Sequence, residues 1–146
     1  MKIYIGSDHG GFAYKQTLIK HLTAKGHEVT DVGCDSLASC DYPDYALPVA
    51  KAVAEKRAEV GVLICGTGIG MSIAANKVKG VRASLCGDVF SAKATRAHND
   101  SNVLCMGARV IGEGLMLEIA DAYLSTTFEG DRHVKRLNKI AEIENN

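Results

Sequence analysis

Apolar residues along this chain occur in short runs that alternate with polar and glycine-rich segments. Runs typical of strands, rich in Val, Ile and Cys, lie at residues 2–6, 27–32, 60–65, 81–86 and 102–106. Segments typical of helices lie between or after them, at residues 12–25, 44–56, 71–77, 89–97 and 113–124. A charged amphipathic segment at about 131–143 closes the chain. The pattern predicts five successive strand–helix units and a C-terminal helix.

Strand–helix alternation is typical of an α/β domain with a parallel sheet. The run VGVLIC at 60–65 is apolar along its whole length, as in a strand that is covered on both faces. No linker and no repeat divides the chain. We therefore expect one domain, residues 1–146, with a five-stranded parallel Rossmann-like sheet in a three-layer α/β/α sandwich.

Local signals mark several element ends. Gly26 should end the first helix, and Asp44 is a candidate N-cap for the helix at 44–56. Pro48 is expected near the first turn of that helix, where a proline is tolerated. Asp8 is a candidate N-cap for the first helix.

Composition narrows the classes of function. The 146 residues carry 17 basic and 17 acidic side chains, so bulk positive charge for nucleic-acid binding is missing. No run approaches the roughly 18 apolar residues of a membrane span, and the N-terminus turns polar too soon for a signal peptide. The odd number of cysteines and the absence of C-x-x-C argue against a zinc site or a disulfide framework and favour the reducing cytoplasm. The cysteines are Cys34, Cys40, Cys65, Cys86 and Cys105. A cytoplasmic enzyme or a small-molecule binder remains.

In an open parallel sheet, ligands bind beyond the carboxyl ends of the strands. The segments there are 7–9, 65–70 and 86–88. The glycines of GTGIG (66–70) do not fit G-x-G-x-x-G, since Met71 or Ile73 stands at the third glycine position, and no Walker motif occurs. Backbone N–H groups that converge here could still hold an anionic oxygen. The alternative is an ordinary tight turn.

Cys65 stands directly before these glycines, where backbone amides would favour a thiolate, and Thr67 adds a hydroxyl. Cys86 and Cys105 are better explained as buried structural cysteines. His98, at the end of a helix, is from local sequence a dipole-stabilised terminal residue.

Two arginines in the last segment, Arg132 and Arg136, are four residues apart and share a helix face. Together they could bind a phosphate. A solvated basic stripe continued by Lys135 and Lys139 is the alternative.

Taken together, the segments closely resemble the ribose-5-phosphate isomerase B family. The matching stretches are GSDHGG (6–11), DYPDYA (41–46), ICGTGIGMSIAANK (64–77), GVRA (80–83), RAHNDSNVL (96–104), MGARVIG (106–112) and FEGDRHVKR (128–136). The resemblance implies interconversion of ribose 5-phosphate and ribulose 5-phosphate without a metal or organic cofactor.

The resemblance also implies roles for particular residues. Cys65 would be the base, Thr67 would assist proton movement between the oxygens, and His98 would open the ring. Asp8 and Tyr42 would contact the sugar, and Asn99 the enediolate. The loop residues implied to bind substrate are Gly66, Gly68, Ile69 and Gly70. The residues implied to bind phosphate are His9, Arg109, Arg132 and Arg136.

Family members place the active site between two subunits, so a homodimer or higher homo-oligomer is expected, with the C-terminal helix packed on a partner. One branch replaces the cysteine with a glutamate after the glycines; Met71 stands there, so the chain resembles the cysteine branch. Galactose-6-phosphate isomerase relatives divide the two active-site segments between different chains, whereas this chain carries both. Allose 6-phosphate is the alternative substrate, and a nucleotide- or phosphate-binding regulatory module is the alternative of another class.

Overall fold

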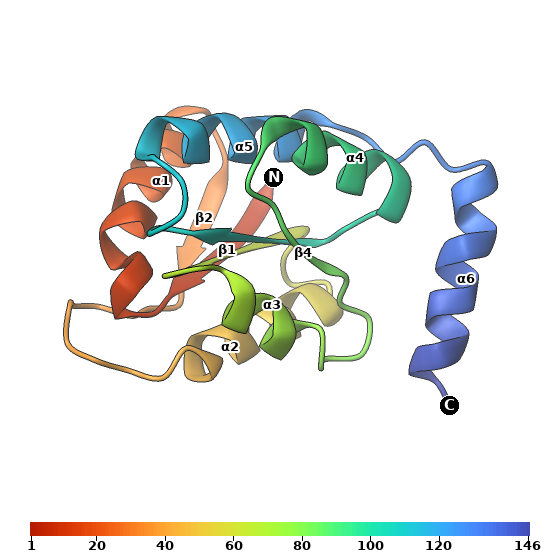
Figure 1. Cartoon of the computed structure of the whole chain (residues 1–146), viewed down its shortest axis with the longest axis horizontal. Helices are drawn as coiled ribbons and strands as arrows, with labels where there is room; N and C mark the ends of the chain where they lie inside the picture. Colours follow the sequence, from red (N-terminus) through yellow and green to blue (C-terminus); the bar gives the residue numbers. More distant parts are fainter.

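The computed structural model describes residues 1–146 and places five parallel strands in one sheet between layers of helices (Figure 1). The strands are β1 (Lys2–Ser7), β2 (Glu28–Asp31), β3 (Val60–Cys65), β4 (Ala83–Leu85) and β5 (Val103–Gly107). Their order across the sheet is β2-β1-β3-β5-β4, and every neighbouring pair is parallel. The predicted three-layer α/β/α class and its five-stranded parallel sheet are confirmed.

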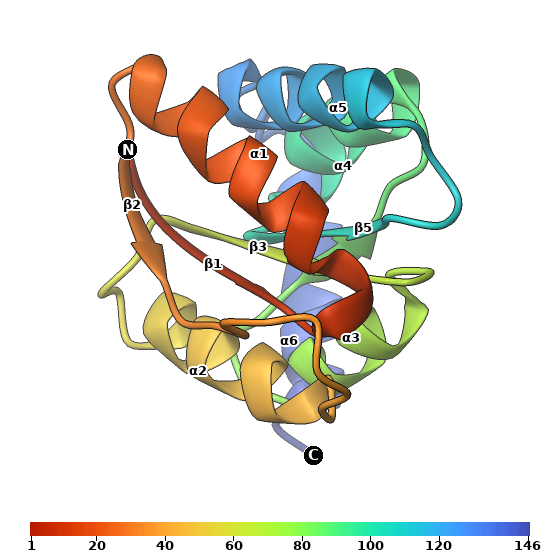
Figure 2. The same ribbon diagram turned by 90° about the vertical axis from the view of Figure 1, so that its left-hand side faces the viewer.

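Helices cover both faces of the sheet, as Figure 2 shows. One face carries α1 (Phe12–Ala24), α4 (Val89–Asn99) and α5 (Glu113–Ser125), and the other carries α2 (Pro43–Ala54) and α3 (Ile69–Ala75). A 3-10 turn, His9–Gly11, joins β1 to α1. No helix of the chain has both the length and the apolarity needed to cross a bilayer.

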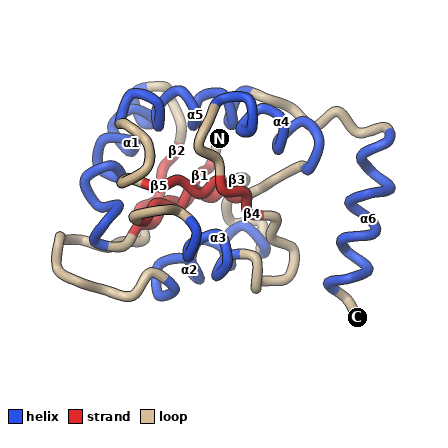
Figure 3. The backbone as a smooth tube through the Cα atoms, viewed as in Figure 1, coloured by secondary structure: helices blue, strands red, loops and turns tan.

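The last helix, α6 (Arg132–Glu144), stands apart from the layers. Figure 3 shows it projecting at the side of the molecule, beyond α4 and β4. Of its residues only His133 is buried, and Val134, Ile140 and Ile143 are exposed apolar side chains. At its far end Glu144 accepts a hydrogen bond from the Gly80 amide, at 2.5 Å. The helix therefore leaves much of its surface, including these apolar side chains, exposed in the single chain.

Two apolar cores lie on either side of the sheet, because successive strand residues point to opposite faces. In β3, Val62 and Ile64 pack toward α1 and α5, whereas Leu63 and Cys65 pack toward α2 and α3. All six residues of β3 are buried, as its apolar sequence predicts.

The strand order reverses between β1 and β3. From β1 the chain moves outward to β2 through α1, and from β3 it moves the other way through α3 on the opposite face. Such a switch point opens a crevice at the carboxyl ends of the two strands. The register pairs Ser7 with Ile64 there, so the residues that follow both strands begin side by side.

Most predicted boundaries agree with the structure to within two residues. The predicted N-cap at Asp44 is wrong: α2 begins at Pro43, whose fixed φ suits the first helical position, and Asp44 lies in the first turn. Pro48 lies inside α2, beyond its first turn. α3 begins at Ile69 rather than at residue 71, because Gly68 adopts a left-handed conformation, φ 78°, directly before it.

Candidate active site

Cys65 is the last residue of β3, and a tight turn leads from it into α3. The turn brings the backbone N–H of Gly68 to 3.1 Å from the Sγ of Cys65, to which it donates a hydrogen bond. A side chain at Gly68 would be strained by the positive φ and would meet the Met106 backbone at 2.8 Å. The glycine is therefore required if an amide is to reach the sulfur.

Thr67 lies at the top of the same turn. Its Oγ1 accepts a hydrogen bond from the Ile69 amide at 3.2 Å. The end of β5 packs against this turn, since a Cβ on Gly107 would lie 2.6 Å from the backbone carbonyl group of Thr67. The Arg109 amide, two residues further on, donates to the Gly66 carbonyl at 2.9 Å. The loop after β5 thus fixes the glycine turn after β3.

The loop after β1 faces this turn. Asp8, which is buried, accepts a hydrogen bond from the Gly11 amide at 3.1 Å and caps the 3-10 turn that leads into α1. The prediction that Asp8 caps the first helix is wrong in that form, because the N-cap of α1 is Gly11 and Asp8 caps the short 3-10 turn before it. This cap still holds the carboxylate at the carboxyl edge of the sheet. Nδ1 of His9 accepts the Cys40 amide at 3.3 Å. Since a ring nitrogen that accepts carries no proton, the neutral ring has its proton on Nε2, which is free to donate.

These loops converge around Gly10. A Cβ placed there would lie 3.3 Å from Oδ1 of Asp8, 3.4 Å from the Gly66 nitrogen and 3.5 Å from Nη2 of Arg109. The guanidinium also lies over Gly66, whose Cβ would be 3.2 Å from Nη1. A carboxylate, a backbone amide and a guanidinium therefore meet at one point, where an oxygen-rich ligand could take several hydrogen bonds.

Tyr42 comes from the long loop before α2 and reaches the start of α3. A Cβ on Gly70 would lie 2.5 Å from the Tyr42 ring, so the ring rests against the backbone of this glycine. Tyr42 is 40% exposed, so part of this residue remains open to solvent. The structure thus unites one group of the sequence-predicted site residues: Asp8, His9, Tyr42, Cys65, Gly66, Thr67, Gly68, Ile69, Gly70 and Arg109.

A second group lies apart from the first within the chain. His98 and Asn99 end α4, and Arg132 and Arg136 lie on α6. The recorded polar contacts of these four residues are to Arg82, to Glu129 and within α6, and none is to the first group. Arg132 and Arg136 are exposed. One chain therefore presents the predicted site as two separate halves.

The ring of His98 stacks on that of His133, with the centroids 4.5 Å apart and the planes at 16°. Glu129 faces both rings, at 4.0 Å from Nε2 of His98 and 3.6 Å from Nε2 of His133. Nearly parallel rings direct their nitrogen lone pairs side by side rather than toward a common point. The three residues therefore suit mutual ion pairing better than a shared metal ion.

The cavities of the single chain leave the first half open. None is lined by Cys65, His9 or Arg109. A hollow of about 290 Å³ lies next to the glycine turn, on the side of Thr67, Leu85 and Val110. A second, of about 320 Å³, lies beside His98 with Phe90 and Glu129. A pocket that encloses a ligand over Cys65 would need further walls.

Cys86 and Cys105 are buried in the apolar cores of the domain. Burial raises the pKa of Cys86 to about 11 and raises that of Cys105 further above its ordinary value. Both thiols thus stay protonated at neutral pH, in keeping with the structural role predicted for them. All five cysteines are unpaired.

Several residues that shape the site carry no chemical signal in the sequence. Gly10 and Gly107 matter only for what approaches them in space. Cys40 contributes a backbone amide to His9 across 31 positions. Arg82 precedes β4, and its guanidinium reaches the main chain at the end of α4, 17 positions further along the chain. A search for sequence motifs finds residues whose side chains can take part in a reaction. It does not find contacts between the backbones of distant segments.

The chain is similar to known proteins along almost its whole length. The family model described as "Ribose/Galactose Isomerase" matches residues 3–140. Ribose-5-phosphate isomerase B of Escherichia coli is 49% identical over 143 residues, which cover 98% of this chain and 96% of that protein. A Clostridium thermocellum ribose-5-phosphate isomerase B structure has a TM-score of 0.98 at 49% identity, covering 99% of this chain and 98% of the other. A Mycoplasma genitalium structure with bound ribulose-5-phosphate has a TM-score of 0.95 at 41% identity, covering 98% and 95%. The chain belongs to the ribose/galactose isomerase family.

Proposed function

We propose that the protein interconverts ribose 5-phosphate and ribulose 5-phosphate by moving a proton between C2 and C1 through an enediolate. The observation that carries the proposal is the hydrogen bond from the Gly68 amide to the Sγ of Cys65, at 3.1 Å, in a turn of further amides. The E. coli relative bears the name of this activity, and the M. genitalium structure contains ribulose-5-phosphate. Membership of the family supports the same reaction.

Cys65 would act as the base that carries the proton between the two carbons. A positioned acid–base group contributes typically about 10²–10⁴ in rate. Thr67 would relay the proton between the two oxygens, and the amides from Gly66 to Gly70 would stabilise the enediolate charge. Each aimed amide is typically worth about 10²–10³ in kcat. These steps need only the chain's own groups and no added cofactor.

Ribose 5-phosphate is mostly cyclic, so the ring must open before the proton moves. His98 would open the ring, with Asp8 and Tyr42 on the sugar hydroxyls or ring oxygen and Asn99 at the enediolate. The position of Asp8 supports its part, since its Oδ1 and the Gly66 nitrogen both border Gly10. His98 and Asn99 would reach the sugar from a partner subunit.

Phosphate would bind at the edge of the same site. His9 can donate from Nε2, and Arg109 lies over Gly66, so both suit an anionic ligand. Arg132 and Arg136 would complete the phosphate contacts from α6. Phosphate binding far from the reacting carbons supplies energy for orienting them.

We infer a homodimer or higher homo-oligomer with shared sites. The separation of the two groups of site residues supports this arrangement, as do the exposed apolar residues of α6, Val134, Ile140 and Ile143. Unpaired cysteines fit a reducing compartment, so we also infer a cytoplasmic location. Each chain would be one domain that supplies half of each active site.

Turnover of the purified protein on ribose 5-phosphate and on allose 6-phosphate, compared by kcat/KM, tests the proposal. A preference for ribose 5-phosphate is expected. A large preference for allose 6-phosphate would change the proposed substrate but not the proposed type of reaction. Tight binding of a nucleotide in calorimetry, without isomerase activity, would instead favour a regulatory module.

A further inference from the structure

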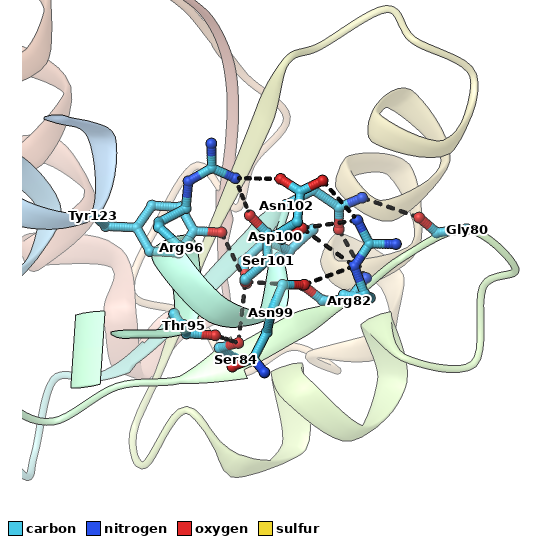
Figure 4. Close-up of polar contacts among 11 residues, drawn as sticks. Gly80, Arg82, Ser84, Thr95, Arg96, Asn99, Asp100, Ser101, Asn102 and Tyr123 are labelled. Atoms are coloured by element: carbon cyan, nitrogen blue, oxygen red, sulfur yellow. Dashed lines mark hydrogen bonds and ion pairs between the residues drawn. The ribbon is translucent and has the colours of Figure 1, made fainter. Parts of the chain in front are cut away.

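Arg82 precedes the edge strand β4 and lies against the C-terminal end of α4 (Figure 4). Its Nε donates to the carbonyl oxygens of Asn99 and Asp100, at 3.0 and 3.2 Å. Its Nη2 donates to the Asp100 carbonyl at 2.8 Å and lies 3.3 Å from that residue's carboxylate. One guanidinium thus binds two successive peptide groups and a side chain at the point where the helix stops.

This helix end needs support. The last four carbonyls of a helix have no partner within it. Asp100, the residue directly after α4, has a φ of +45°, a conformation that a residue with a side chain seldom adopts. The planar guanidinium of Arg82 donates hydrogen bonds to the carbonyls of Asn99 and Asp100. These hydrogen bonds hold the turn after α4 in one geometry.

The main chain of Arg82 is itself fixed. Its N–H donates to Oδ1 of Asn102 at 2.8 Å, and its carbonyl accepts from the Asn102 amide at 3.0 Å and from Ser101 Oγ at 2.9 Å. Ser101 is fully buried and bonds to the hydroxyl of Tyr123, also fully buried, at 2.8 Å. The guanidinium therefore projects from a rigid frame toward the end of α4.

The side chains carried by this helix end are loosely held. His98 has 43% of its side chain exposed, stacks on His133 and approaches Glu129 only to 4.0 Å. The directions of His98 and Asn99 thus depend on the backbone that carries them. We propose that Arg82 is a positioning residue for His98 and Asn99 and holds them in the direction in which they act on the sugar. The inference rests on the function proposed above.

A merely structural arginine would also lower activity, by reducing the amount of folded protein. The two roles differ once His98 and Asn99 are gone. A positioning residue has then nothing left to position, so its removal costs no further turnover, whereas a purely structural loss would be repeated in full. A double-mutant cycle measures this difference.

The experiment compares four proteins, each at equal concentration of folded chain by circular dichroism: wild type, Arg82→Ala, the pair His98→Ala with Asn99→Ala, and all three changes together. Arg82→Ala should lower kcat about 10- to 100-fold in the wild-type background, since small misplacements of catalytic groups cost this much. In the background without the pair, the same change should alter kcat by less than about twofold. Arg82→Lys should recover part of the loss, because an ammonium can reach one carbonyl but lacks the fork. Arg57→Ala, which removes an exposed arginine paired with Glu55, is the matched control and should leave kcat unchanged.

Two results would overturn the positioning role: wild-type kcat in Arg82→Ala, or an equal loss in both backgrounds. Wild-type kcat in the protein without the pair would overturn it too, and would leave the isomerase activity itself standing. Failure of the proposed function is a separate result, namely no turnover of ribose 5-phosphate by the unaltered protein.

Discussion

The Gly68 amide points at the sulfur of Cys65, and it can do so only because Gly68 adopts a positive φ of 78°. The sulfur is thus an acceptor in the folded chain, the role that a base must fill. Cys65 is buried, with 5% of its surface exposed, so bulk water has little access to it. A base shielded from water and bordered by amides suits the transfer of a proton between two neighbouring carbons.

Replacing Cys65 with Ala should remove most of the turnover, by about 10²-fold or more, because the proposed base is lost. Substrate binding should persist, since the residues proposed to bind phosphate are other ones. Steady-state kinetics and calorimetry with ribose 5-phosphate measure the two quantities. Cys40→Ser is the control, since the backbone amide of Cys40 keeps its hydrogen bond to His9, and the new hydroxyl group can replace the contact of Sγ with Nδ1 of His9, at 3.9 Å. Near-normal turnover of the alanine variant would remove Cys65 as the base.

Gly107→Ala should disturb the glycine turn that follows β3, because Gly107 packs directly against it. The added Cβ would lie 2.6 Å from the Thr67 carbonyl group, so the Thr67 backbone must move. We expect a loss of about 1–3 kcal/mol in the free energy of unfolding, as for other overpacked sites. The kcat of the folded protein should also fall, because the amides shift.

Gly114→Ala provides the matched control for that change. Gly114 lies in the first turn of α5, and nothing stands within 4 Å of its added Cβ. The free energy of unfolding should rise by about 0.4–1 kcal/mol, because alanine restricts the unfolded chain. Urea unfolding and kcat measure both variants, and similar effects of the two changes would contradict the role given to Gly107.

The sequence predicted the class of the fold because hydrophobic periodicity is a local property, and the runs at 2–6 and 60–65 lie within one residue of the observed β1 and β3. Strand order was not predictable, since it depends on contacts between distant segments. The side-chain pattern predicts a start of α3 two residues after the observed one, because the left-handed Gly68 lets the helix begin earlier.

Motifs led to both halves of the candidate site. Their division into two groups was expected only from the family resemblance, because no local pattern tells whether His98 and Cys65 face each other within one chain. The local interpretation of His98 as a residue of the last helical turn also agrees with the structure. Its stack on His133 was not foreseen, since the two rings meet only when α6 packs on α4.

Replacing Arg132 or Arg136 with Ala should raise KM for ribose 5-phosphate and leave the fold intact, because both side chains are exposed. Hydrogen bonds to charged groups contribute about 1.5–3 kcal/mol, so an increase of about 10-fold or more is expected for each. Lys139→Ala, a change on the same helix, is the control for loss of general positive charge. If KM stayed unchanged in the arginine variants, the solvated basic stripe would be the better interpretation.

Asp88 should make stability depend on pH in the acid range. Its carboxylate accepts the amide of Ser91 at 2.6 Å and the hydroxyl of Ser91 at 2.9 Å, and these hydrogen bonds lower the pKa of Asp88 below its ordinary 3.8. The unfolded chain binds this proton more readily than the folded one does, so the stabilisation exists above about pH 4 and disappears as the pH falls through the folded pKa.

Asp88→Asn tests this dependence, because asparagine can still cap α4 but does not titrate. Wild type should be more stable than the variant above about pH 4, and the difference should shrink at lower pH. Urea midpoints measured across the acid range give the comparison. A difference that does not change with pH would contradict the titration of Asp88.

The division of the site between subunits can be tested with two variants of greatly reduced activity. In a homodimer with shared sites, each site joins Cys65 of one chain to His98 of the other. Mixing Cys65→Ala with His98→Ala, after mild unfolding and refolding together, yields mixed dimers in which one site has lost both residues and the other has regained both. Random pairing makes half of the dimers mixed, so about a quarter of the wild-type sites should return.

Recovered activity would have to come from such dimers, because neither parent contains an intact site. The matched control mixes Cys65→Ala with a double variant that carries both changes; every site then lacks at least one of the two residues, and no activity should return. A site built within one chain would give no recovery in either mixture, since each chain would keep its own defect. Turnover that rises only in the first mixture would therefore establish that His98 acts on sugar held by the Cys65 of a partner.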